Sequence, residues 1–325
     1  MPDCKMTYPS YTAAIRTLGK SGDAFVALIH SLEAQTVPPS AIHVYIAEGY
    51  ERPKQVSGEK YFTCPRGLAT QRALPFKEIT TDYILFLDDD LTLASDAVKM
   101  LFDGLMEHDG DCIAPNIYPN HHWSFKQKLV QGIFYHTLPL FGGKYAFKIR
   151  RSSYYSYCNH PDKVMISQSC AGACMLMKTQ AYRNMHYQDE VWLDKVPFAS
   201  GQDQLFAYKL FRSGYNLLIH YNVEIQHLDA QTGHIRDEVK ADYGKRFVRY
   251  LIWLRTIKEP DTFFRRILDI CAFYGVWCWQ LLLSLISFVK GNRSETRNIA
   301  SALVDARRFS KSNEFSSIPK WKVSR

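Results

Sequence analysis

The sequence has 325 residues, of which 46% are apolar and 22% are charged, and its formal net charge is +8. This length and balance exclude a disordered chain and allow one large domain or two. The positive charge suits phosphate-bearing ligands, anionic lipid or nucleic acid, and it does not choose among them. Eight scattered cysteines without a CxxC pair argue against a zinc site and fit a reducing compartment.

Four elements are expected within the first 75 residues. Cys4–Tyr8 is interpreted as a short first strand. A helix follows, because apolar residues recur at the i, i+3, i+4 and i+7 positions of one helical face. These residues are Phe25, Leu28, Ile29 and Leu32. Ile42–Ala47 is expected to be a second strand with Glu48 at its carboxyl end, and Gly67–Leu74 a short helix stopped by Pro75.

An acidic triplet follows an unbroken apolar run at Tyr83–Leu87, which is typical of a strand buried on both faces of a parallel sheet. The triplet is Asp88, Asp89 and Asp90. Ligands of open α/β sheets bind beyond the carboxyl ends of the strands, and three adjacent carboxylates there favour a divalent cation, Mg²⁺ or Mn²⁺. The alternative is a solvated acidic turn that caps the next helix.

The region after the triplet continues the alternation of helices and strands. Ser95 is expected to cap a helix with an apolar face. That face consists of Val98, Leu101, Phe102 and Leu105. Ile113–Asn116 is expected to form another strand. Strands and helices that alternate at this spacing predict a doubly wound α/β domain.

The stretch from Tyr118 to His160 is irregular and rich in aromatic and basic residues. Such a mixture can hold an acidic or sugar-bearing partner, a lipid interface or single-stranded nucleic acid. The alternative is an extended excursion that packs on the main domain.

A second carboxylate of interest, Asp203, lies in the first turn of a helix that is expected to end at Gly214. The positive end of the helix dipole favours an ionised carboxylate there, and such a group can act as a general base. A plain N-terminal cap is the more common role. Cys170–Met177, a small-residue turn leading into a strand, precedes this helix, and the strand Tyr215–Ile219 follows it. His227 is either structural or a metal ligand.

Near the end of the chain, Ile267–Val289 is 23 residues long and contains one charged residue. Its length suits a helix that spans a bilayer, and the alternatives are a helix in the membrane interface or a helix hairpin packed on the domain. Its polar residues fall on one stripe, which consists of Asp269, Gln280, Ser284 and Ser287. A basic tail after Gly291 suits anionic lipid. Because the first residues carry no apolar targeting segment, we expect the main domain on the cytoplasmic side of the membrane.

In this order the motifs resemble the family 2 glycosyltransferases, which have a GT-A fold. The resemblance is carried by Ser31–Thr36 with Pro39, Ile42 and Val44, Gly67 with Gln71 and Arg72, Tyr83–Asp90, and Gly201–Asp203 followed by Ser213–Tyr215. It implies a Rossmann-like, mostly parallel sheet flanked by helices over residues 1–255, with 118–160 as an aromatic and basic excursion. Residues 256–325 would form a helical, membrane-associated extension that contains the apolar helix 267–289 and the basic tail.

The resemblance also implies metal-dependent transfer of a sugar, with inversion, from a nucleotide-diphosphate donor to a hydroxyl of a glycan or glycolipid acceptor. This chemistry would serve surface polysaccharide or glycolipid synthesis, with no nucleic acid as partner. Asp203 would be the general base, and Asp90 with His227 would hold Mg²⁺ or Mn²⁺. The donor nucleotide would contact Glu48, Arg72, Asp88 and Asp89.

Two other interpretations remain open from the sequence. Asp88-x-Asp90-x-Thr92 after an apolar strand also fits the signature of haloacid-dehalogenase-type phosphohydrolases, with Asp88 as nucleophile. The weak first strand and Gln202, where the family usually has an acidic residue, also allow a catalytically degenerate membrane-bound scaffold.

Overall fold

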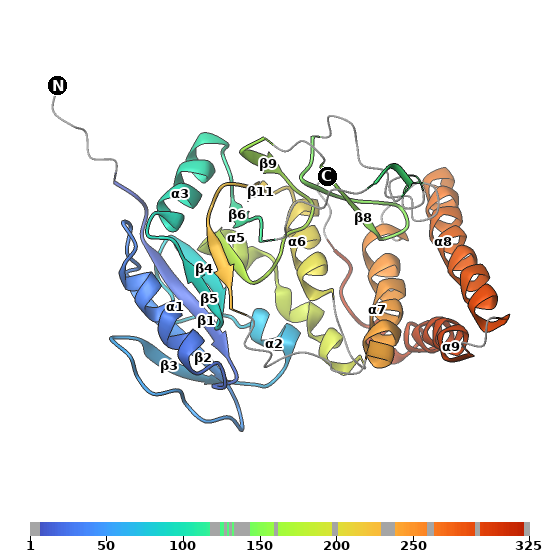
Figure 1. Ribbon diagram of the computed structural model, residues 1–325, viewed down its shortest axis with the longest axis horizontal. Helices are drawn as coiled ribbons and strands as arrows, with labels where there is room; N and C mark the ends of the chain where they lie inside the picture. The colour runs from blue at the N-terminus through green and yellow to red at the C-terminus, as the bar shows by residue number, and fades with distance from the viewer. Residues whose placement is uncertain are drawn as a thin grey trace.

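The computed structural model describes residues 7–117, 144–158, 162–196, 201–228, 238–258, 263–289 and 293–321, with residues 124–126, 129 and 132 between them. Across these residues a central sheet has the strand order β3-β2-β1-β4-β10-β6-β11-β9 (Figure 1). Of these described strands, β9 and β10 run antiparallel to their neighbours and the others share one direction. The strands are β1 Tyr11–Thr17, β2 Ala41–Ala47, β3 Lys60–Cys64, β4 Tyr83–Asp88, β6 Cys112–Pro115, β9 Val164–Ile166, β10 Cys174–Lys178 and β11 Leu217–His220.

Helices cover both faces of this sheet (Figure 1). They are α1 Asp23–Glu33, α2 Leu68–Arg72, α3 Ala97–Glu107, α5 Thr179–Asn184, the 3₁₀ helix η1 Tyr187–Lys195, and α6 Gln202–Arg212. α1 and α3 pack on the face that receives Ile15 and Leu87. The other helices pack on the face that receives Ala14 and Phe86. Because side chains alternate along a strand, successive residues of β1 and β4 serve two cores.

Two small sheets lie beside the central one. β5 (Leu91–Leu93) begins directly after the acidic triplet and pairs antiparallel with β12 (Ile225–His227). β7 (Phe147–Ile149) and β8 (Tyr155–Tyr157) form an antiparallel hairpin. Pairing with β5 brings β12 next to the acidic triplet at the end of β4.

The described chain after residue 237 is helical. It consists of α7 Glu238–Trp253, a π-helical turn Leu254–Lys258, α8 Phe263–Val289, α9 Arg293–Phe309 and α10 Asn313–Ser316. Trp253, Phe273 and Ile299 from these helices belong to the same core as the α6 face of the sheet. The predicted boundary between residues 255 and 256 falls inside the continuous helical segment 238–258, and the division into two domains stays a prediction.

The contact between these helices and the main sheet layer is centred on a buried carboxylate, Glu190 of η1. It accepts two hydrogen bonds from Arg255, at 2.7 and 2.8 Å, and one from Lys209 at 3.0 Å. The indole N–H groups of Trp192 and Trp321 donate to it as well, at 3.0 and 2.8 Å. This network joins η1, α6, the π-helical turn and the end of the described chain.

Helix α8 lies at the edge of the molecule, far from α1 and β3 (Figure 1). Of the described helices, it alone is long and apolar enough to cross a membrane, judged by length and composition. Three polar residues within its apolar stretch, Asp269, Gln280 and Ser284, are buried. Arg151 pairs with Asp269 at 2.6 Å. Its outward surface is therefore apolar, with Leu282 among its exposed residues.

The structure confirms the α/β class and three predicted elements, which are the helix at 23–33, the strand before the acidic triplet and the helix that begins at Gln202. The expected first strand, Cys4–Tyr8, lies partly outside the described residues, and its described end, Thr7 and Tyr8, is not in a strand. The first described strand is Tyr11–Thr17, whose buried polar residues, Thr12 and Arg16, hide the apolar pattern. Ser95 does not cap α3: the N-cap residue is Asp96, without a side-chain capping bond. Most of the excursion 118–160 lies outside the described residues, and its described part holds β7 and β8.

Candidate active site

Two neighbouring strands bring Arg16 and Asp88 together at the carboxyl edge of the sheet. The parallel register of β1 and β4 sets them opposite one another, on the face that α6 covers. Arg16 Nη2 donates to Asp88 Oδ1 at 2.8 Å and to the carbonyl oxygen of Gly172 at 3.0 Å. Burial, together with the charge of Arg72, lowers the pKa of Arg16 to about 10, so this side chain is cationic at neutral pH.

Arg72 joins this strand end to the start of α6. It is the last residue of α2, and its Nη1 lies 2.8 Å from Oδ1 of Asp203. Its Nη2 lies 3.7 Å from Oδ2 of Asp88. The side chain of Arg72 is only 10% exposed, whereas the side chains of Asp88 and Asp203 are 33% and 29% exposed. One buried cation therefore connects the two carboxylates and leaves both accessible to a ligand.

Gly172 permits this close arrangement. Its carbonyl oxygen accepts from Arg72 at 2.9 Å as well as from Arg16. A Cβ atom at this position would lie 2.0 Å from Arg72 Nη1 and 2.2 Å from Asp203 Oδ1. Any larger residue would therefore displace the ion pair between Arg72 and Asp203.

The short helix α2 is held in place by Asp194 of η1. The carboxylate of Asp194 accepts hydrogen bonds from the backbone N–H groups of Ala69 and Thr70, at 2.8 and 2.7 Å. Gly67 precedes the helix with a φ of +152°, and a Cβ atom there would lie 2.2 Å from Asp194 Oδ2. Asp194 thus fixes the orientation of the helix that presents Arg72.

The two later members of the triplet lie deeper than Asp88. Thr17 donates a short hydrogen bond to Asp89, and burial raises the pKa of Asp89. Pairing of β12 with β5 sets His227 opposite Leu91. As a result, Nε2 of His227 lies 3.4 Å from Oδ1 of Asp90. The structure therefore brings together the two residues that the sequence suggested for a metal.

A cavity of about 350 Å³ opens at this edge of the sheet, within the range of about 300–1,000 Å³ found for small-molecule sites. Its described lining includes Arg16, Arg72, Asp88, Asp89, Asp90 and His227. Asp203 borders a smaller neighbouring cavity that shares Arg16 and Arg72 with the first. Glu48 is exposed at the end of β2 and is not among the described residues that line either cavity.

Few protein side chains at this site are placed to bind a metal ion. In the described part of the chain, no three His, Cys, Asp or Glu side chains are grouped so that they could hold a metal ion. Asp90 and His227 supply two donors. Mg²⁺ is usually held by one or two carboxylates together with substrate phosphates. The pair therefore fits a metal held jointly with a diphosphate and not a closed site made by protein alone.

Three residues of this site escaped the sequence analysis. Arg16 required the correct position of β1, after which its register with β4 would have placed it beside Asp88. Gly172 stands in a small-residue turn without a distinctive pattern, and Asp194 lies in a 3₁₀ helix that is not amphipathic. No local sequence signal marks the last two.

The profile of glycosyl transferase family 2 matches residues 28–211. Among solved structures, S. aureus TarS is similar in fold, with a TM-score of 0.53 at 13% identity over 95% of this chain and 50% of TarS. TarS 1-349 gives 0.51 at 12% identity, over 91% and 80% of the two chains. GalNAc-T7 with UDP, GalNAc and Mn²⁺ gives 0.52 at 12% identity, over 77% of this chain and 50% of that chain.

This chain thus spans half the length of GalNAc-T7 and of the longer TarS chain. No curated protein sequence matches it. Similarity at 12–13% identity establishes a shared fold.

Proposed function

This chain belongs to glycosyl transferase family 2, and we propose that it moves a sugar from a nucleotide-diphosphate donor to an acceptor hydroxyl, with inversion at the anomeric carbon. The observation that carries the proposal is the Arg72 bridge. The guanidinium of Arg72 lies between Asp203 and Asp88, so that Asp203 is close to the acidic end of β4. A donor in the cavity beside Asp88 would therefore present its sugar toward Asp203. The GalNAc-T7 structure contains UDP, GalNAc and Mn²⁺, which supports a donor of this class.

In this reaction Asp203 would be the general base. The acceptor oxygen attacks the anomeric carbon, the bond from that carbon to the phosphate oxygen breaks, and its electron pair leaves with the diphosphate. The carboxylate of Asp203 takes the proton of the attacking hydroxyl. Its partial exposure leaves room for an acceptor, and a positioned general base contributes on the order of 10²- to 10⁴-fold.

Binding of the donor's diphosphate would depend on charge complementarity. Arg16 and Arg72 supply two buried cations beside the cavity, and guanidinium groups suit phosphate oxygens. Asp90 and His227 would hold Mg²⁺ or Mn²⁺. When bound, the cation would neutralise charge that develops on the leaving diphosphate. Asp88 and Asp89 would face the nucleoside, and Glu48 would approach the nucleobase or ribose from the end of β2.

A membrane-bound acceptor, a glycan or glycolipid, fits the apolar outward surface of α8. The exposed side chains at the start of this helix include Phe264, Arg265 and Arg266. Apolar residues beside cations suit a bilayer with anionic headgroups. The described cysteines are free, which agrees with the reducing cytoplasmic side.

A thermal-shift panel tests the donor assignment. UDP, GDP, ADP and dTDP are each added with Mn²⁺, with Mg²⁺ or with EDTA. We expect one diphosphate to raise the melting temperature with metal and to lose most of this effect in EDTA, because ligand that binds only the folded state stabilises it. Asp90→Asn should remove the metal-dependent part, and the exposed Asp96→Asn should keep it. If no nucleotide shifts the melting temperature with either metal, the donor assignment is wrong.

A further inference from the structure

Helix α2, which carries Arg72, is too short to fix its own position. It has five residues, and isolated helices shorter than about 12 residues are marginal in water. The 3₁₀ helix η1 holds it at both ends. Asp194 accepts hydrogen bonds from two backbone N–H groups of its first turn, at 2.8 and 2.7 Å, and Gln188 donates to the carbonyl oxygen of Ala73 at 2.7 Å. The position of the Arg72 guanidinium therefore depends on where η1 lies.

η1 is held in turn by the last described part of the chain, Ser312–Trp321, which we call segment 312–321. The ring of Phe315 packs edge-on against that of Trp192, with 5.1 Å between the ring centroids, and Glu314 forms an ion pair with Lys195. Because an exposed ion pair contributes little, most of this stabilisation comes from the two rings. In the sequence, the two contacted residues of η1 lie on either side of the carboxylate that holds α2.

A second contact between η1 and segment 312–321 is buried. The indole N–H of Trp321 donates to the carboxylate of Glu190 at 2.8 Å, and Glu190 is fully buried. Arg255, which pairs with the same carboxylate, donates to the carbonyl oxygen of Pro319 at 2.9 Å. Hydrogen bonds to ionised groups are roughly twice as strong as neutral ones. The segment is therefore bonded both to η1 and to the π-helical turn that carries Arg255.

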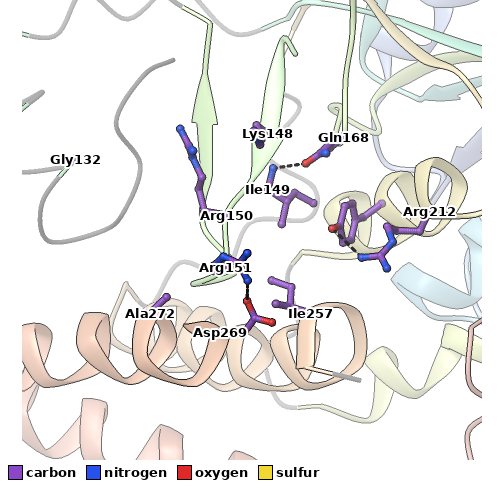
Figure 2. Close-up of a pocket in the computed structure, with 11 residues that line it drawn as sticks. Gly132, Lys148, Ile149, Arg150, Arg151, Gln168, Arg212, Ile257, Asp269 and Ala272 are labelled. Carbon is purple, nitrogen blue, oxygen red and sulfur yellow. Dashed lines mark hydrogen bonds and ion pairs between the residues drawn. The ribbon is translucent and has the colours of Figure 1, made fainter. Parts of the chain in front are cut away.

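The π-helical turn brings α6 and α8 to the same region. It packs against both helices. Ile257 of the turn lines one cavity together with Arg212 of α6 and Asp269 of α8 (Figure 2). α6 carries Asp203 in its first turn. The elements that support Arg72 and Asp203 therefore meet at the π-helical turn and segment 312–321.

We propose that Asp194 is a positioning residue, which holds Arg72 in place for the donor diphosphate, and that segment 312–321 stabilises this position by holding η1. The proposal rests on the proposed function, in which Arg72 meets the phosphates. Asp194 is not among the described residues that line either cavity of the active site, so it acts through α2. If η1 shifts, α2 follows it, and the guanidinium moves away from Asp88 and Asp203.

Amide hydrogen exchange, followed by mass spectrometry on peptides that cover residues 67–74, tests these contacts without any substrate. Asp194→Asn should raise exchange in α2 at least about fivefold, because the amide nitrogen cannot accept the second hydrogen bond and local opening becomes easier. Phe315→Leu/Trp321→Phe keeps apolar side chains but removes the edge-on ring contact and the indole N–H. This double variant should raise exchange in the same peptides.

The controls are Asp96→Asn and Lys320→Gln, at exposed positions, and they should exchange like the wild type. Melting temperatures verify that each variant folds, and Trp321→Phe alone replaces the double variant if that does not fold. Unchanged exchange in Asp194→Asn would overturn the role of Asp194. Faster exchange in Asp194→Asn but not in the variant of segment 312–321 would overturn the role of that segment.

A double-mutant cycle on ligand binding separates a positioning role from a merely structural one. The probe is whichever of UDP, GDP, ADP and dTDP shifts the melting temperature most with Mn²⁺. Asp194→Asn should raise the dissociation constant of this probe at least about threefold in the wild type but less than about 1.5-fold in the Arg72→Met background, because residues that act through one another are not additive. Equal losses in both backgrounds would overturn the positioning role. If no diphosphate binds the wild type, the proposed function fails and the positioning role with it, whereas the exchange result still reports on the contacts.

Discussion

The guanidinium of Arg72 lies 2.8 Å from the carboxylate of Asp203, although the two residues come from different helices and are far apart in the sequence. The same guanidinium lies 3.7 Å from Asp88 at the end of β4. The part of the site that would bind the sugar donor and the part that would bind the acceptor therefore share one side chain, that of Arg72. A change that moves Arg72 should disturb both.

Gly172→Ala tests this connection without removing any functional group. The added methyl carbon would lie 2.0 Å from Arg72 Nη1, so Arg72 and Asp203 must move. Displacement of positioned groups by about 1 Å can cost about 10²-fold in rate. We expect a loss of about that size in kcat/KM for sugar transfer, with a melting temperature near that of the wild type.

Gly58→Ala is the matched control, because a Cβ atom there meets nothing within 4 Å. Near-normal activity of Gly172→Ala would show that the Arg72–Asp203 geometry is not needed for turnover.

Glu190 should govern the acid stability of the protein. Burial alone would raise the pKa of Glu190, but the hydrogen bonds and charge of Arg255, with the charge of Lys209, outweigh it and lower the pKa to about 2. Because the folded-state pKa lies below the ordinary value of 4.5, this stabilisation is present above pH 4.5 and is lost as the pH falls toward 2.

The variant Glu190→Gln leaves two buried cations without their carboxylate, and breaking such a pair costs about 3–5 kcal/mol. Urea unfolding at pH 7 should report this loss, and the difference from the wild type should shrink as the pH falls toward 3. The exposed Glu107→Gln serves as control. A difference that stays constant between pH 7 and pH 3 would contradict the assigned role.

The outward face of α8 should bind bilayers. Leu282 and Ile286 are 49% and 47% exposed. Leu282→Asn/Ile286→Asn should reduce co-flotation with anionic vesicles at least about tenfold, because burial of such side chains is worth about 1.5–3 kcal/mol each. Val26→Asn, at an exposed position of α1, should float like the wild type. If the α8 variant floats equally well, or if its loss accompanies dissociation of a dimer, this face does not contact membrane.

The sequence revealed the elements whose pattern is local. The apolar run before Asp88 and the helix that carries Asp203 could both be placed within a residue or two, because their burial shows in consecutive residues. β1 could not be found in this way. Thr12 and Arg16 are polar residues that are buried by partners distant in sequence, so their polarity conceals that this segment is a buried strand.

The order of motifs identified the family, but not the contacts that connect them. Arg72 and Asp203 meet because β10, which follows Gly172, inserts between β4 and β6, and nothing local encodes that insertion. Three residues of the predicted polar stripe of α8, Asp269, Gln280 and Ser284, are buried, yet their inward direction depends on Arg151 and on the packing of α7 and α9. The phosphohydrolase alternative, built on Asp88, has no support from the family that matches.

Asp203→Asn, examined with donor binding and sugar transfer side by side, tests the central claim most directly. The amide keeps the size of the side chain but cannot accept the proton of the acceptor hydroxyl. We predict that transfer falls on the order of 10²- to 10⁴-fold while the donor dissociation constant changes less than about threefold. Near-full transfer by Asp203→Asn would contradict the account.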